Sequence, residues 1–203
     1  MENQACSRSE KIKEFAAELL EKRFEENATR ILSEVFEKNT DTDYYKNLKQ
    51  AFIEACNKCV KKQENNEKKK IAYVGVHFLK SSMITNSHDL YINFYDRELY
   101  VDRNETYAIW SPKEILKYYE EDAKFFESNI SKKIVRPTFS EIQEIKMNLY
   151  GDYLKIVEQV FKCYVFKLVE LEEFASVKKD VNYAVFFSPY MEMGMPLCIG
   201  RGE

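Results

Sequence analysis

The sequence predicts an α+β fold in which a small antiparallel sheet packs against long helices. Apolar residues recur at three- and four-residue steps over several long segments, which is the period of an amphipathic helix. Between residues 71 and 102 the pattern changes to alternation, with many aromatic and β-branched side chains, and this indicates strands. The chain has only 5 Gly and 4 Pro in 203 residues, too few for the many tight turns of an all-β sandwich.

Two helices are expected at the start of the chain, joined as an antiparallel hairpin over about residues 7–64. Ser7 opens the first helix with the Ser-x-x-Glu spacing of a capping box. An apolar stripe from Ile12 to Phe36 predicts about eight helical turns. A second helix is expected to begin near Asp43. We expect one domain over 1–203, with this hairpin as its semi-independent part.

Residues 71–102 are expected to form a three-stranded antiparallel meander, on which the rest of the fold is organised. The first strand begins at Ile71, the second is expected at Leu90–Phe94, and the third is expected to start at Leu99. A single apolar face predicts that helices cover one face of the sheet. A fourth strand is predicted over 181–187 and is expected to join this sheet.

Two further helices are predicted between the meander and the fourth strand. Ser111, Pro112 and Glu114 offer an N-cap hydroxyl, a proline at the first helical position and a capping carboxylate. Thr138 opens another capping box, and helical spacing continues from there to about Leu171. The tail of residues 188–203 is compatible with a loop or with a short return strand.

Charge and composition exclude several classes of protein. The formal net charge is -3 with interspersed signs, which argues against a nucleic-acid-binding role, since such modules usually carry a basic face. The clearest basic cluster, Lys61, Lys62 and Lys68–Lys70, is interpreted as a solvated turn. No stretch approaches the roughly 20 apolar residues of a membrane span, and the cysteines are scattered, so we expect a soluble protein in the reducing cytoplasm.

The most visible motif is Cys56-x-x-Cys59. A Cys-x-x-Cys pair can ligate zinc or carry redox chemistry, but redox pairs open a helix after a strand. This pair lies late in a predicted amphipathic helix, on its apolar side, and we interpret both residues as core. The alternative is a Cys2His2 zinc site that adds His77 and His88, although these two histidines are more widely spaced than in compact zinc sites.

No recognised catalytic motif is present in the sequence. Neither a Gly-x-Ser-x-Gly elbow nor a phosphate-binding P-loop occurs. Carboxylates gather around the meander, where they are typical turn formers whose side chains bond the local backbone. A cation site or an acid–base pair is the alternative. These carboxylates are Asp89, Asp96, Asp102 and Glu105.

Aromatic residues on or near the predicted strands are the best functional candidates. Tyr and Trp are favoured anchors for ligands and protein partners, provided that several share the face away from the helices. Cross-strand packing that stabilises the sheet is the alternative. The candidate binding residues, with the strand histidine, are Tyr73, His77, Tyr91, Tyr95 and Trp110.

The sequence thus predicts a protein- or ligand-binding module without catalysis and without a cofactor. Self-association through the long first helix is expected, because its stripe exceeds what one short partner helix covers. The alternative is a metal-dependent or acid–base enzyme with its site around His77 and His88. The segment YINFYDRELYVD, followed by Trp110, resembles a stretch in proteins of low-GC anaerobic bacteria; this resemblance covers a hairpin and implies no family or activity.

Overall fold

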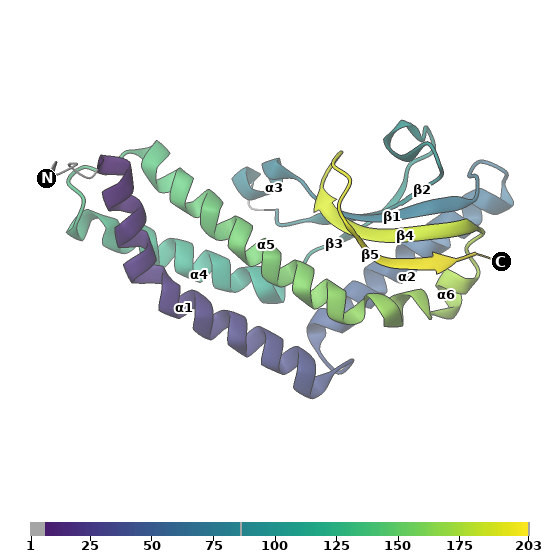
Figure 1. Cartoon of the computed structure of the whole chain (residues 1–203), viewed down its shortest axis with the longest axis horizontal. Helices are drawn as coiled ribbons and strands as arrows, with labels where there is room; N and C mark the ends of the chain where they lie inside the picture. The colour runs from purple at the N-terminus through teal and green to yellow at the C-terminus, as the bar shows by residue number, and fades with distance from the viewer. Residues whose placement is uncertain (1–6, 86, 203) are drawn as a thin grey trace, which may run out of the picture.

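The computed structural model describes residues 7–85 and 87–202 and has the predicted α+β class. In Figure 1 the molecule is elongated, with α1, α4 and much of α5 at one end and the sheet with α2 and α6 at the other. The helices are α1 (Arg8–Lys38), α2 (Asp43–Glu64), α3 (Lys80–Thr85), α4 (Lys113–Asn129), α5 (Phe139–Val169) and α6 (Glu172–Ala175), with 3₁₀ turns η1 (Leu99–Val101) and η2 (Ile130–Lys132). The strands are β1 (Ile71–Phe78), β2 (Leu90–Tyr95), β3 (Thr106–Trp110), β4 (Lys179–Pro189) and β5 (Pro196–Arg201).

The sheet has five strands in the order β3-β2-β1-β4-β5. The expected meander is present as three consecutive antiparallel strands, β1 to β3. The predicted fourth strand is also present, but it lies beside β1 in parallel, so the sheet is mixed. The tail forms a return strand, β5, antiparallel to β4.

The predicted start of the third strand at Leu99 is wrong, because Leu99–Val101 form the 3₁₀ turn η1 and the strand begins only at Thr106. Asp102 explains the difference. Its carboxylate accepts hydrogen bonds from the backbone N–H groups of Asp96 and Asn104 and pairs with the buried ammonium of Lys68. These contacts fold residues 96–105 into a loop.

The two faces of the sheet are covered by different parts of the chain. Val74 and Val76 lie on the face toward α2 and α5, in one apolar cluster that continues into the helices. No helix was predicted on the opposite face, but its centre is covered as well, since His77 and Tyr95 are fully buried there. Figure 1 shows the loop between β2 and β3 and the β4–β5 turn rising on this side.

Helix caps follow the sequence at two of three predicted positions. Ser7 and Thr138 form complete capping boxes at the starts of α1 and α5. The capping box predicted at Ser111 is wrong: Pro112 is the N-cap of α4, and the Ser111 hydroxyl instead donates to the Asp89 carboxylate. A long-range partner therefore outcompetes the local cap.

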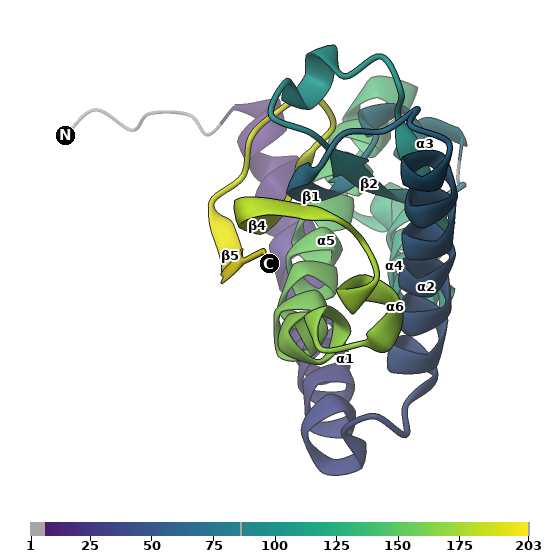
Figure 2. The same cartoon turned by 90° about the vertical axis from the view of Figure 1, so that its right-hand side faces the viewer.

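The two N-terminal helices follow each other across a short link, as expected, but they pack on different parts of the molecule. α1 lies along α4 and α5, whereas α2 lies against β3 and β2 (Figure 2). The fully buried Asp122 of α4 holds the first group together. It accepts hydrogen bonds from Arg23 (2.8 Å) and Asn27 (3.3 Å) of α1 and from the Tyr153 hydroxyl of α5 (2.7 Å).

Candidate functional site

His77 of β1 is enclosed in an aromatic cage on the sheet face away from the helices. The centroids of four neighbouring aromatic rings lie 5.4–5.8 Å from the centroid of the imidazole ring. The Nδ1 atom lies 3.2 Å from the Ser188 hydroxyl, and Nε2 has no hydrogen-bond partner. Burial therefore lowers the pKa of His77 from 6.5 to about 4. The caging rings are those of Tyr95, Tyr100, Phe186 and Tyr190.

The other predicted aromatic residues divide between the two sheet faces. Tyr73, Tyr91 and Tyr95 share the face of His77, where the first two are half-buried and Tyr95 is fully buried. Trp110 pairs with Leu90, lies on the helix side and packs against Phe161. Of the five residues predicted from the sequence, three tyrosines and His77 thus share one face of the sheet, whereas Trp110 belongs to the core.

The four residues of the alternative zinc site lie in separate places. Cys56 and Cys59 belong to the core cluster beneath the sheet, and burial raises the pKa of the Cys59 thiol to about 12. His77 lies on the opposite face. His88 lies 3.2 Å from Glu120 and stacks on Tyr150 of α5. Across residues 7–85 and 87–202, no group of three or more potential ligands is placed to hold a metal.

Two of the four carboxylates near the meander serve local structure. Asp96 and Asp102 accept hydrogen bonds from backbone N–H groups two residues ahead, as turn-forming Asp residues do. The Asp89 carboxylate accepts a hydrogen bond from the Ser111 hydroxyl, and the Glu105 carboxylate accepts one from the Tyr190 hydroxyl, with 3.0 Å between the two oxygens. The turn-forming interpretation therefore fits Asp96 and Asp102, whereas Asp89 and Glu105 bond side chains that are distant in the sequence.

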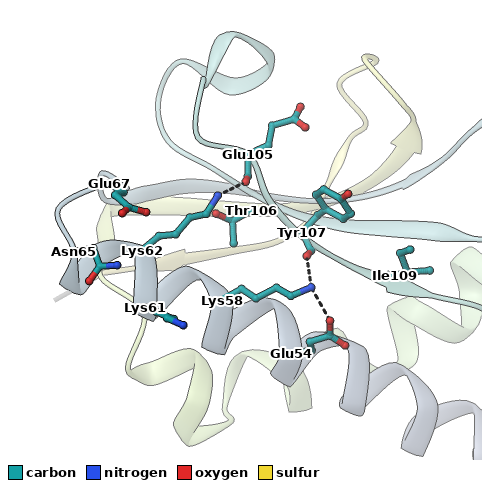
Figure 3. A pocket seen from close by; sticks show the side chains of 10 residues that line it. All are labelled: Glu54, Lys58, Lys61, Lys62, Asn65, Glu67, Glu105, Thr106, Tyr107 and Ile109. Atoms are coloured by element: carbon teal, nitrogen blue, oxygen red, sulfur yellow. Dashed lines mark hydrogen bonds and ion pairs between the residues drawn. The ribbon is translucent and has the colours of Figure 1, made fainter.

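A groove of about 640 Å³ runs between α2 and the free edge of β3 (Figure 3). Lys58 and Lys62 reach across it from α2, and Tyr107 and Ile109 come from the strand. Lys62 Nζ donates to the Glu105 carbonyl at 2.6 Å, and Lys58 Nζ donates to the Tyr107 carbonyl at 3.2 Å. Both carbonyls point away from β2.

These two lysines cap the β3 edge of the sheet. An uncovered strand edge presents rows of N–H and C=O groups that can pair with another chain, and lysines commonly block such pairing. A strand added here would have to displace both ammonium groups from their carbonyls. The groove in Figure 3 is therefore the protected edge of the sheet.

The opposite edge, β5, has no such cap. The Gly202 N–H donates to the Val181 carbonyl of β4. Because every second residue of an antiparallel strand bonds to the same neighbour, Gly202, Gly200 and Cys198 turn their backbone groups toward β4. The backbone groups of Ile199 and Arg201 therefore face away from β4. In the part of the chain that the structure describes, β5 pairs with β4 alone, and no side chain donates to a β5 carbonyl. This edge is open for pairing.

Exposed apolar side chains accompany the open edge. Ile199 is 71% exposed on β5, and Met195 just before the strand is 85% exposed. Met191 and Met193 in the β4–β5 turn and Val181 on β4 are also exposed. Flexible methionines are common at protein-binding surfaces because they adapt to different partners. Sequence reasoning missed this surface, although the three methionines of residues 191–195 beside a short apolar run were its signal.

The lysine cluster that the sequence assigned to a solvated turn is divided among four environments. Lys61 and Lys62 line the α2–β3 groove, and Lys68 is buried against Asp102. Lys69 pairs with Glu98 at 2.7 Å, and Lys70 faces a separate cleft. The cluster is therefore not a single basic face.

Comparisons of the chain with protein-family models, curated proteins and solved structures give no match. None of the helices within the described ranges combines the length and the apolar character needed to cross a bilayer.

Proposed function

We propose that this protein is a non-catalytic protein-binding module that takes an extended segment of its partner as an additional strand on β5. The observation that supports the proposal is the contrast between the two sheet edges. Lysines of α2 occupy the outward carbonyls of β3, whereas the outward backbone groups of Ile199 and Arg201 have no such cover. An edge left open on a protein that caps its other edge favours strand addition there.

The chemistry of the surface supports a protein partner. Main-chain hydrogen bonds to a sheet edge give affinity for any extended backbone, and neighbouring side chains select the sequence. Ile199 and the methionines at 191, 193 and 195 offer adaptable apolar contacts beside the edge. The half-buried Tyr73 and Tyr91 of the original aromatic prediction lie farther from this edge, on β1 and β2.

The test uses proline to remove a single outward N–H from each edge. Ile199→Pro deletes the outward donor of β5 without removing a hydrogen bond to β4, and proline is tolerated at such edge positions. Ile109→Pro is the matched control, because Ile109 occupies the equivalent outward position on the lysine-capped β3. Both variants are first compared with the wild type by thermal melting.

A display library of extended eight-residue peptides is then selected on the wild-type protein, and affinities are measured by fluorescence anisotropy. We expect Ile199→Pro to weaken the selected peptides at least about tenfold, the scale of one or two lost backbone hydrogen bonds. Ile109→Pro should leave affinity within about twofold. An equal loss of peptide affinity in both variants, or a loss of affinity in Ile109→Pro alone, contradicts strand addition at β5.

Self-association through α1 is a second proposal, supported by an apolar groove of about 430 Å³ between α1 and α5. Much of the α1 stripe is already covered within the chain, but Ala17 and Phe24 line this groove. Light scattering at micromolar concentration should report a dimer that Ala17→Glu converts to monomer. Thr29→Glu, which also adds a charge to exposed α1, should leave the dimer intact; a wild-type monomer contradicts the proposal.

We also propose that the protein is located in the cytoplasm. The four cysteines in the described residues all carry free thiols, which fits a reducing compartment. Fractionation of the native host with an antibody to this chain would test it. Recovery from the membrane or secreted fraction contradicts the prediction.

A further inference from the structure

A cleft of about 530 Å³ lies at one end of the sheet, where α6 leads into β4 and where β5 ends. Lys70 borders it just before β1, Lys178 and Lys179 border it at the start of β4, and Arg201 borders it at the end of β5. Among its lining residues there are four cationic side chains and no carboxylate. The cleft is therefore positively charged, although the formal net charge of the chain is -3.

Three of these cations are available to an incoming ligand. In the described residues, the side chains of Lys70, Lys178 and Arg201 form no ion pair and no hydrogen bond. Lys179 differs, because its ammonium donates to the carbonyls of Phe174 (2.7 Å) and Val177 (2.7 Å) and so caps the end of α6. It adds positive charge to the wall without being free to move.

The neighbouring carboxylate does not neutralise the cleft. Asp180 follows Lys179, and its carboxylate makes a two-point contact with the guanidinium of Arg97. The hydrogen bond from Arg97, aided by the field of Lys70, lowers the pKa of Asp180. Asp180 is therefore ionised and its carboxylate is bonded to Arg97, so it forms no ion pair with Lys70, Lys178 or Arg201 within the described residues.

We propose that this cleft binds carboxylates of the segment that adds to β5, so that the partner segment is acidic. The inference rests on the strand addition proposed above. Arg201 connects the two features, since its backbone belongs to the outward edge of β5 and the residue also lines the cleft. An added strand that extends past Arg201 reaches the end of the sheet where the cleft opens, and its acidic side chains would be directed toward the positive charge there.

Charge complementarity selects this occupant over a neutral or basic segment. Side chains of a strand alternate between the two faces of a sheet, with about 7 Å between neighbours on one face. A segment with acidic residues at every second position can therefore direct more than one carboxylate toward the same cleft. Opposite charges placed this way steer binding and exclude partners of the wrong sign.

The experiment uses three alternating eight-residue peptides with blocked ends: (Val-Glu)4, (Val-Gln)4 and (Val-Lys)4. All three offer the same backbone and the same valine face, so differences report the charged face alone. Affinities for the full chain are measured by fluorescence anisotropy at low and at physiological salt. We expect (Val-Glu)4 to bind about tenfold more tightly than (Val-Gln)4 at low salt, with a smaller difference at higher salt.

The Lys70→Gln, Arg201→Gln double variant removes two of the free cations. It should weaken (Val-Glu)4 to the affinity of (Val-Gln)4 and leave (Val-Gln)4 within about twofold. The matched control, Lys11→Gln with Lys22→Gln, removes the same charge from α1, which does not line the cleft. It should leave the preference for (Val-Glu)4 unchanged.

The outcomes separate this inference from the proposed function. Equal affinity for the glutamate and glutamine peptides, with both weakened by Ile199→Pro, overturns the acidic partner but supports strand addition. A preference for (Val-Glu)4 that Ile199→Pro does not affect supports an anion-binding cleft and contradicts strand addition on β5. No binding of (Val-Glu)4 at millimolar concentration overturns the inference outright.

Discussion

The cage around His77 makes the stability of the protein sensitive to mild acid. In the folded chain the imidazole is fully buried among four aromatic rings, and its pKa is lowered to about 4 by that burial. In the unfolded chain it returns to about 6.5. Between these two values the unfolded chain binds the additional proton, so acidification in that window favours unfolding.

The size of the effect follows from the two pKa values. The stabilisation from keeping His77 neutral is fully present above pH 6.5 and is lost progressively as the pH falls toward 4. Each pKa unit corresponds to 1.36 kcal/mol, so the whole shift represents about 3 kcal/mol, of which about 2 to 3 kcal/mol is lost between pH 7 and pH 4.5.

The measurement is urea unfolding at a series of pH values in the wild type and in His77→Phe. Phenylalanine cannot titrate, so the free energy of unfolding of His77→Phe should depend less on pH than that of the wild type, by the amount that His77 contributes. Because the readout is the difference between two pH values, any packing cost of the larger ring cancels. The chain has two histidines, so the variant also identifies the His77 signal in an NMR titration.

A single result would refute this reasoning. If wild type and His77→Phe lose the same free energy of unfolding between pH 7 and pH 4.5, within about 0.5 kcal/mol, then burial of the imidazole does not control acid stability. An NMR titration midpoint for His77 near 6.5 would independently contradict the burial argument.

Two further predictions concern stability. Lys68→Met should lower the free energy of unfolding by about 3–5 kcal/mol, because it leaves the buried Asp102 carboxylate without its ion pair. Lys69→Met removes an exposed ion pair and should lower it by no more than about 1 kcal/mol. Denaturant titration compares the two variants, and equal losses would contradict the burial argument. Gly75→Ala should cost about 1–3 kcal/mol, because a Cβ there would lie 2.2 Å from His77 Nε2, and the cost should fall in a His77→Ala background; an unchanged cost there would show that the ring is not the obstacle.

Local signals in the sequence predicted much of the fold correctly. The hydroxyls of Ser7 and Thr138 cap helices because both partners of each capping box lie within three residues. Period-two alternation located β1, β2 and the core of β4 for the same reason. These elements depend on neighbours along the chain, which a single sequence displays directly.

The errors came from contacts between distant residues. The local pattern predicts a strand at Leu99 because the residues around it do not show that Lys68, 34 residues before Asp102, anchors this segment as a loop. The same pattern predicts a cap at Ser111 because its actual partner, Asp89, lies 22 residues before it.

The candidate site was harder to predict than the fold for a related reason. A pattern of tyrosines marks residues that lie near the sheet, but it cannot say which face or edge is covered. The capping of β3 by Lys58 and the exposure of Ile199 on β5 depend on the strand order, which places β4 between β1 and β5. That order became visible only in three dimensions.

The parallel pairing of β1 with β4 has a consequence for how the chain folds during synthesis. About 100 residues separate the end of β1 from the start of β4, and this interval contains β2, β3 and the helices α3 to α6. While the ribosome is producing it, at roughly 5–20 residues per second, β1 has no neighbour on that side. For several seconds the nascent protein therefore exposes one unpaired edge of β1, whose N–H and C=O groups can pair with another chain until β4 emerges.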